Sequence, residues 1–396
     1  MTYMRSENEP VVEEYPPEKI KRVRRFSRKA FLIFAPVHLY VGWSLLPDLP
    51  IEYHHQLFGA LLLVVSGIII PFGTLSAVYV KNQNAVDRLV WSGSLAMGLF
   101  SSLLVFTLFR DLVLLIPNLD PWTSQSATLV VVMAGILTLV GFFNARRVAK
   151  VVRVDISLEN LPHDLNGFTI AQISDIHVGP TIKGDYVQAV VERVNAESPD
   201  VIAITGDVVD GKVGHLAKET QSLSQLKARY GAFVVTGNHE YYSGAEAWMQ
   251  EFSRLGLQPL MNEHAVIEHN GESLVIAGVT DYSAANFDKT QASDPQAALL
   301  GSPQDTPKVL LAHQPRTAEA ADKAGFDLQL SGHTHGGQFW PWNHFVKMQQ
   351  PFTAGLNRLG DLLIYTSRGT GYWGPPKRFG APSEITLIRL SDGKAR

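Results

Sequence analysis

The chain has 396 residues, no cysteine and a formal net charge of −3; 46% of its residues are hydrophobic and 18% are charged. Soluble domains are about 25% charged, so this chain is poor in charge. Its length suggests two or three structural units of roughly 100–200 residues each. The lack of cysteine excludes disulfides, thiolate metal ligands and thiol nucleophiles. The slightly acidic balance gives no basic footprint, so we expect no nucleic-acid partner.

The charged residues are unevenly distributed along the chain. Residues 1–150 carry 14 Lys and Arg and 10 Asp and Glu, whereas residues 151–396 carry 20 and 27. Four apolar runs within the first part contain no charged residue and approach the ~20 residues that cross a membrane. A buried soluble bundle is the alternative, but soluble helices keep a polar face. We therefore predict four transmembrane helices within residues 30–145. The runs are Ala30–Leu46, Leu57–Val80, Leu89–Phe109 and Ala127–Phe143.

Lysine and arginine mark one side of these predicted helices. Basic residues lie before the first run, in the second loop and after the fourth run, whereas the first loop has Asp48 and Glu52 but no Lys or Arg. The third loop is expected to begin at Arg110 and Asp111. Basic loops stay cytoplasmic, which predicts a basic cytoplasmic tail over residues 1–29, a multi-pass protein of the cell (inner) membrane and a cytoplasmic catalytic domain. The basic residues are Lys19, Lys21, Arg22, Arg24, Arg25, Arg28, Lys29, Lys81, Arg88, Arg146, Arg147 and Lys150.

From about residue 150 the pattern changes to short β-branched runs separated by helical stretches. Strands that alternate with helices indicate an α/β class, and we expect one such domain over residues 150–396. The expected strands are Phe168–Ile173, Val201–Ile204, Ala232–Val235, Leu274–Ala277, Val309–Leu311, Leu328–Leu330, Leu362–Tyr365 and Glu384–Ile388. The expected helices include Tyr186–Ala196, Leu216–Arg229, Ala245–Leu255 and Thr317–Ala324.

Potential metal ligands follow five of these strands. Open α/β sheets place their sites at the carboxyl ends of strands, and neighbouring glycines let the backbone turn sharply and approach a ligand. All the donors are oxygens or nitrogens, they outnumber the ligands of one tetrahedral zinc, and they suit two cations that share a carboxylate. One such motif alone is weak, but five in order are a strong joint signal. The motifs are Ser-Asp175-Ile-His177, Thr-Gly-Asp207, Thr-Gly-Asn238-His239-Glu240, Ala-His313-Gln-Pro and Ser-Gly-His333-Thr-His335-Gly-Gly.

This series of motifs resembles the calcineurin-like metallophosphoesterase family. The longer segments Ile-Ser-Asp-Ile-His-Val-Gly and Gly-His-Thr-His-Gly-Gly-Gln are similar to its bacterial membrane-anchored branch. The resemblance covers roughly residues 150–390 and does not extend to the apolar runs. It implies a four-layer α-β-β-α domain, here preceded by the four-helix transmembrane region.

The resemblance also implies residue roles and a reaction, the hydrolysis of a phosphoester or pyrophosphate bond by a metal-bridging hydroxide. His239 would stand beside the phosphate, where it could donate a proton to the leaving oxygen. The family often has Asp where Glu240 stands, so the orienting role of that carboxylate is open. The four imidazoles favour Mn, Fe, Zn or Co over Mg. The first metal would be held by Asp175, His177 and His335, the second by Asn238, His313 and His333, and Asp207 would bridge them.

The substrate is open between three hypotheses. The first is a lipid-linked phosphate compound, the second is a soluble nucleotide with the helices as a plain anchor, and the third is a non-catalytic metal-dependent binding module. Aromatic residues that follow His335 could form an apolar rim at the bilayer surface, whose cations would bind a lipid headgroup, or they could pack the domain edge. The residues are Phe339, Trp340, Trp342, Phe345, Met348, Phe352, Tyr372 and Trp373, with Arg368, Lys377 and Arg378.

Overall fold

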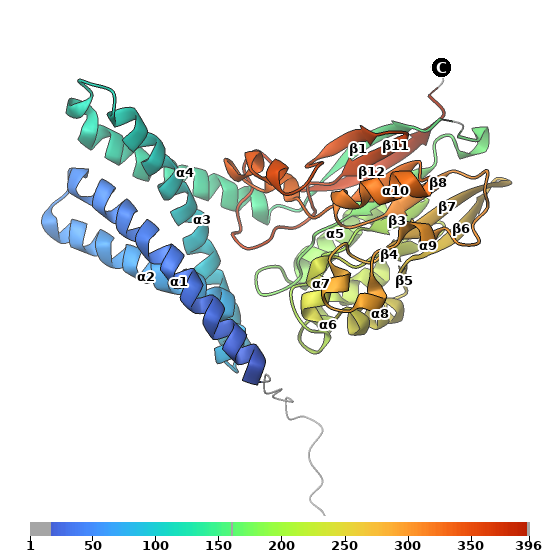
Figure 1. The fold of residues 1–396 in the computed structure, drawn as a ribbon, viewed down its shortest axis with the longest axis horizontal. Coiled ribbons are helices and arrows are strands. Elements are labelled where there is room, and N and C mark those ends of the chain that lie inside the picture. The colour runs from blue at the N-terminus through green and yellow to red at the C-terminus, as the bar shows by residue number, and fades with distance from the viewer. Residues whose placement is uncertain (1–16, 160, 394–396) are drawn as a thin grey trace, which may run out of the picture. The chain divides into compact units, whose positions relative to one another are not determined.

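The computed structural model describes residues 17–159 and 161–393, and for residues 17–30, 74, 77, 78 and 120 it describes the backbone alone. Residues 1–16 of the predicted tail therefore lie outside the described residues. The chain divides into two compact units, one up to Thr138 and one from Leu139 onward (Figure 1).

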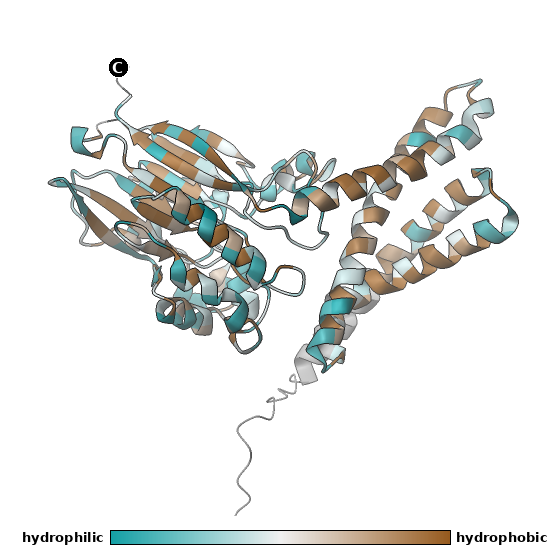
Figure 2. Ribbon diagram, turned by 180° about the vertical axis from the view of Figure 1, so that it is seen from behind, coloured by the Kyte–Doolittle hydropathy of each residue, from teal (hydrophilic) through white to brown (hydrophobic). Residues whose placement is uncertain are grey.

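Long apolar helices make up the described part of the first unit. Each is long and apolar enough to cross a membrane, and Figure 2 shows hydrophobic residues along most of their length. A helix that is apolar on every side is typical of a membrane span, and each of the four predicted runs lies on one of these helices to within one residue at its end. They are α1 (Pro17–Leu45), α2 (Tyr53–Tyr79), α3 (Gln83–Leu114) and α4 (Thr123–Arg146), whose last turns belong to the second unit.

The prediction that Arg110 and Asp111 begin a loop was wrong, because α3 continues to Leu114. The Arg110 guanidinium is buried and forms ion pairs with Asp48 and Asp111. The hydroxyls of Tyr40 and Ser44 donate hydrogen bonds to the Asp111 carboxylate at 2.6 and 2.7 Å. Charged side chains within membrane helices persist when they pair with one another, so this network lets α3 continue past Arg110 and Asp111.

The second unit contains two six-stranded mixed sheets. Parallel strands form the centre of each sheet, and antiparallel pairs occur at β12–β2, β10–β11 and β6–β7. The first sheet has the order β1 (Lys150–Ser157), β12 (Glu384–Ser391), β2 (Thr169–Ile173), β3 (Val201–Ile204), β4 (Ala232–Val234), β5 (Gln258–Pro259). The second has the order β10 (Gly355–Leu359), β11 (Leu362–Thr366), β9 (Leu328–Ser331), β8 (Lys308–Leu311), β7 (Glu272–Gly278), β6 (Glu263–His269).

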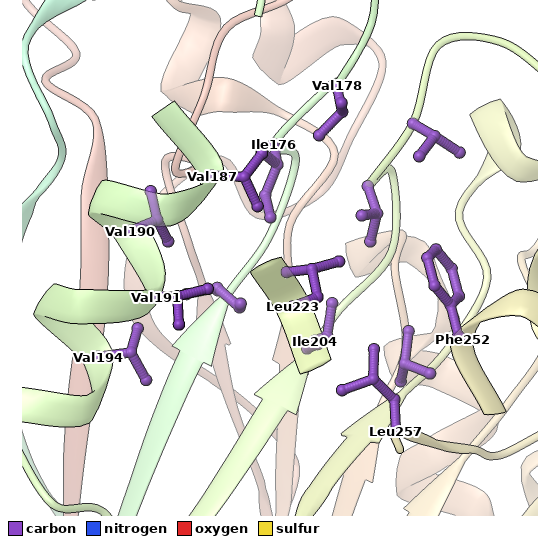
Figure 3. Packing of buried hydrophobic residues seen from close by; sticks show 14 of the residues in the cluster. Ile176, Val178, Val187, Val190, Val191, Val194, Ile204, Leu223, Phe252 and Leu257 are labelled. Carbon is purple, nitrogen blue, oxygen red and sulfur yellow. The ribbon is translucent and has the colours of Figure 1, made fainter. Parts of the chain in front are cut away.

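The sheets pack face to face because their strands are apolar on both faces. In β3, Val201 and Ala203 join the core between the sheets, whereas Ile202 and Ile204 join the core under the helices. Figure 3 shows valines of α5 (Gly184–Ala196) beside Ile204 in that outer core. The first sheet is covered by α5, α6 (Val213–Thr220) and α8 (Ala245–Arg254), and the second by α9 (Pro295–Ala298) and α10 (Ala318–Ala324). This is the four-layer α-β-β-α domain that the family resemblance implied.

Two kinds of secondary structure differ from the sequence prediction. All eight predicted strands form, but β1, β5, β6 and β10 were missed. The predicted helix Leu216–Arg229 is too long, because α6 ends at Thr220 and a 3₁₀ segment follows it over Gln221–Gln225. The Lys227 backbone N–H bonds to the Asn195 side chain of α5 at 2.8 Å. Because the Lys227 N–H donates to this side chain and not to a carbonyl of the preceding turn, the helical stretch ends before Lys227.

We predict that Arg110→Ala lowers the thermal unfolding temperature of the purified protein in detergent. Breaking a buried ion pair costs about 3–5 kcal/mol, and the lower end applies because the Asp48 and Asp111 side chains keep 30% and 31% exposure. The exposed Arg88 supplies the control, since Arg88→Ala removes one positive charge from the start of the same helix. Equal unfolding temperatures for the two variants would contradict a structural role for the Arg110 network.

Candidate metal centre

The predicted site residues lie just beyond strand ends in both sheets, and five of them have a left-handed backbone. Such a conformation costs a non-glycine residue of order 1–3 kcal/mol and is kept mainly at functional sites. The five are Asp175, His177, Asp207, His333 and His335, with φ between 51° and 69°. The complete set is Asp175 and His177 after β2, Asp207 after β3, Asn238 and His239 after β4, His313 after β8, and His333 and His335 after β9.

Asp175, His177 and His335 form one buried group of donors. The Nε2 atoms of His177 and His335 lie 3.1 Å apart. The Asp175 Oδ1 atom is 3.4 Å from Nε2 of His335 and 4.0 Å from Nε2 of His177. Two imidazole nitrogens and a carboxylate oxygen thus converge on one point, as the ligands of a transition-metal ion do.

Asp207, His313 and His333 form a second group. The Asp207 Oδ2 atom is 3.1 Å from Nε2 of His313, which is 3.2 Å from Nδ1 of His333. The same Asp207 oxygen lies 3.9 Å from Nε2 of His177 in the first group. Asp207 therefore stands between the two groups.

Asn238 provides a direct test of whether this site fits metal ions. Its side chain is buried, and within the described residues its Oδ1 atom has no hydrogen-bond partner. The backbone beside it packs against Asp207, whose Oδ1 accepts a 2.8 Å hydrogen bond from the His239 N–H. A Cβ atom on Gly237 would lie 2.2 Å from that oxygen, so only glycine permits this approach. A buried amide oxygen without a partner, next to carboxylates and imidazoles, fits a hard or borderline cation.

Asp210 lies in the candidate site, although no motif in the sequence marks it. Its Oδ1 atom accepts hydrogen bonds from Nδ1 of His177 at 2.8 Å and Nδ1 of His239 at 2.6 Å. Burial opposes the charge on Asp210, but the two histidines hold the pKa of this carboxyl well below its ordinary value. A carboxylate behind an imidazole fixes its orientation and leaves its other nitrogen as the ligand atom. The only signal in the sequence is its position three residues after Asp207.

Comparisons with known proteins identify the family of this chain. Residues 168–337 match the family model of the calcineurin-like phosphoesterases. An uncharacterized metallophosphoesterase of Campylobacter jejuni is 31% identical over 385 residues, which cover 93% of this chain and 99% of that protein. The chain belongs to the calcineurin-like metallophosphoesterase family.

Vertebrate members of the family are similar to this chain over a shorter range. Proteins named transmembrane protein with metallophosphoesterase domain, from Danio rerio and Bos taurus, are 37% and 38% identical to it over 274 and 273 residues. These regions cover 67% and 66% of this chain but only 63% and 62% of the vertebrate proteins, so the chain spans less than two thirds of their length.

Family membership gives this chain a metallophosphoesterase domain, as predicted. The four apolar helices and the names of the vertebrate relatives also indicate a membrane protein.

Glu240, which stands where the metallophosphoesterases often have Asp, supports the backbone of the site. Its carboxylate accepts hydrogen bonds from the N–H groups of Asp207, Val208 and Gly237 at 2.9, 2.8 and 2.6 Å. Burial and the nearby Asp207 raise the pKa of Glu240 to about 7. The longer side chain therefore still fixes the turn that carries Asp207.

The alternative in which Lys377 and Arg378 bind a lipid headgroup is wrong, because each is only 1% exposed. Instead, Arg378 donates to the ligand His335, from Nη2 to Nδ1 at 3.0 Å and from Nη1 to the carbonyl oxygen at 3.0 Å. The Arg378 backbone N–H bonds to the Gly141 carbonyl at the end of α4. The sequence shows that these residues are positively charged. It does not show that residues 371–380 fold into the domain.

The aromatic residues and Met348 beyond His335 divide into buried, partly buried and exposed sets, and Phe352 is partly buried against the core of the second sheet. Phe339 and Tyr372 are buried, so packing at the domain edge is correct for them. Trp373 is exposed, and its ring lies edge-on to His239 with centroids 5.7 Å apart. The exposed set is Trp340, Trp342, Phe345, Met348 and Trp373.

We predict that Asp210→Asn weakens both metal binding and catalysis, because His177 and His239 lose the carboxylate that orients them. Outer partners of metal ligands typically contribute about 10–100-fold in affinity or activity. Activity on a chromogenic aryl phosphodiester, measured across a Mn²⁺ titration, reports both effects. Asp185→Asn removes an exposed carboxylate at the start of α5 and is the matched control. An Asp210→Asn enzyme with the control's titration curve and turnover would show that Asp210 has no positioning role.

Proposed function

We propose that this protein uses two divalent metal ions to hydrolyse a phosphoester or pyrophosphate bond in a lipid-linked substrate, at the cytoplasmic face of the cell (inner) membrane. The position of Asp207 carries the two-metal part of the proposal. Its Oδ2 atom lies 3.1 Å from a histidine of one donor group and 3.9 Å from a histidine of the other. A carboxylate between two groups of ligands suits a pair of cations.

The short distances between donor atoms within the two groups support this role. Bound metal ions would supply an activated water and would offset negative charge on the phosphoryl oxygens. The four imidazoles favour Mn, Fe, Zn or Co over Mg. The first ion would be held by Asp175, His177 and His335, the second by Asn238, His313 and His333, and both by Asp207.

His239 is the protein group best placed to act on the phosphate. Its side chain keeps 15% exposure, and Nε2 lies 3.9 Å from Oδ2 of Asp207 while Nδ1 is fixed by Asp210. Burial opposes its charge, but Asp207 and Asp210 raise the pKa of His239 to about 9. In the absence of bound cations these protein groups favour the protonated ring at neutral pH, because the pKa lies above 7. A protonated His239 can donate a hydrogen bond to a phosphoryl oxygen or a proton to the leaving group.

The surroundings of His239 support an apolar, membrane-bound substrate. Exposed Trp373 and Tyr242 lie edge-on to the His239 ring at 5.7 and 5.2 Å, and exposed Phe287 lies 5.6 Å from Tyr242. The segment that carries Trp373 continues to Arg378, which bonds to the end of α4. Exposed aromatic rings therefore lie beside His239, and the segment that carries one of them is hydrogen-bonded to the end of an apolar helix. The same exposed rings could stack on a nucleobase, so a soluble nucleotide is the second candidate substrate.

We predict that Asp207→Asn and His239→Ala fail in different ways. Asp207→Asn should lose bound metal and activity together, since it removes the charge shared by both donor groups. His239→Ala should retain its metal and turn over about 10²–10⁴-fold more slowly, the usual size of a general acid's contribution. Metal content by elemental analysis and kcat on the aryl phosphodiester separate the two. A His239→Ala protein purified without metal would contradict the assigned role.

We predict that the Mn-loaded protein hydrolyses phosphate compounds attached to a lipid in preference to soluble ones. The assay compares phosphate release or product formation from lipid-linked pyrophosphates in mixed micelles with that from soluble nucleoside diphosphates and cyclic nucleotides. The Asp207→Asn protein in the same micelles measures the background. Preference for soluble nucleotides would favour the second candidate, and the absence of hydrolysis from every lipid would overturn the first.

A further inference from the structure

The segment from Trp342 to Met348 presents an exposed apolar face. Two short 3₁₀ turns, η9 (Trp342–His344) and η10 (Val346–Met348), follow one another there. A 3₁₀ helix has three residues per turn, so residues three apart share a face. Trp342, Phe345 and Met348 therefore lie on one side, and they are 40%, 53% and 83% exposed. The Trp342 and Phe345 rings lie 5.8 Å apart.

This face is held outward by a fixed backbone. Gly337 approaches Asn343 so closely that a Cβ atom would lie 2.1 Å from the Asn343 Cα. At the other end, the Arg316 guanidinium donates to the Gln349 carbonyl, and the Gln350 side chain donates to Gln314 at 3.2 Å. The backbone N–H of Phe345 bonds to the Trp342 carbonyl at 2.9 Å, which keeps the turn regular. The three apolar side chains are thus presented by a braced segment, and such a surface marks an interaction site.

Contacts within the same unit link this face to the end of α4. The Trp340 N–H bonds to the Phe379 carbonyl, and the Arg378 N–H bonds to the Gly141 carbonyl of α4, at 3.0 and 2.9 Å. Figures 1 and 2 both show the short turns of this region beside the last turns of α4. Those turns expose Leu139 and Phe143, which belong to a helix apolar enough to span a membrane.

The charges around the face suit a phospholipid surface. Lys347 is exposed within the segment, and Arg146 and Arg147 are exposed where α4 ends. Basic side chains near an anionic leaflet are each stabilised by about 1 kcal/mol, and Trp and Phe favour the interface between headgroups and acyl chains. Apolar rings flanked by cations, next to the end of an apolar helix, have the chemistry of an interfacial anchor.

We propose that Trp342, Phe345 and Met348 insert into the headgroup region of the bilayer where α4 leaves it. This second attachment fixes how the catalytic domain is oriented on the membrane surface. The inference goes beyond the proposed function, since it holds for either candidate substrate.

The cysteine-free chain allows a direct test with one spin label at a time. Phe345→Cys in the full chain is labelled with a nitroxide in nanodiscs of zwitterionic and anionic phospholipid. Power saturation compares collisions with oxygen, which concentrates in lipid, and with a polar nickel chelate, which stays in water. His344→Cys, on another face of the same turn, and Ser224→Cys, in the 3₁₀ segment beyond α6, are the exposed controls.

We expect a several-fold higher ratio of oxygen to nickel collisions at position 345 than at positions 344 and 224. A ratio at 345 equal to that at 224 would overturn the proposal. Low collision with both reagents, together with dipolar broadening between labels, would identify a second copy of this chain as the occupant and also overturn it. Unchanged hydrolysis of the soluble aryl phosphodiester shows that the labelled protein is folded. Trp342→Cys provides a second labelled position on the same face, with the same expected ratio.

Discussion

The burial of two carboxylates beside one another is the constraint on which this catalytic domain depends. The side chains of Asp175 and Asp207 are almost fully buried, and each lies within 4.0 Å of the same His177 nitrogen. Burial raises the pKa of Asp175, whereas His313 and the other histidines hold the pKa of Asp207 well below its ordinary value, against burial. Buried charges persist only when opposite charge compensates them. Divalent cations would supply that compensation, which explains why the donors converge on two points.

The backbone makes this convergence possible at a cost in strain. Donors reach the centre from two sheets, so the chain must turn sharply after each strand, and five of the donors adopt positive φ. Glycine permits the closest approaches. A Cβ atom on Gly332 would lie 2.0 Å from the Ser174 Oγ atom, and one on Gly371 would lie 2.1 Å from the Ile176 carbonyl oxygen. These positions need glycine because atoms of Ser174 and Ile176 occupy the space that a side chain would fill.

The sequence predicts the central strands well and shows which polar residues follow them, for a physical reason. Strands such as Val201–Ile204 are buried on both faces, so they form continuous apolar runs in the sequence. The polar residues that follow such a run are therefore easy to recognise. Edge strands are different. β1 carries Lys150, Arg153 and Asp155 among its apolar residues, and the sequence of a half-exposed strand of this kind resembles that of a loop. Asp210 and Arg378 were missed or misassigned because their roles come from partners far away in the sequence, which no local pattern shows.

The two histidines of the first donor group form hydrogen bonds with partners of opposite charge. His177 donates from Nδ1 to the Asp210 carboxylate, which increases the electron density of the ring. His335 instead accepts at Nδ1 from Arg378, since a guanidinium can only donate. Burial lowers the pKa of Arg378 to about 10, so it stays charged at neutral pH. Burial and the charge of Arg378 hold the pKa of His335 well below its ordinary value, so this ring is neutral at neutral pH. The arginine that stabilises His335 also bonds through its backbone to α4, so the segment that anchors this helix end also determines the electronic character of one ligand.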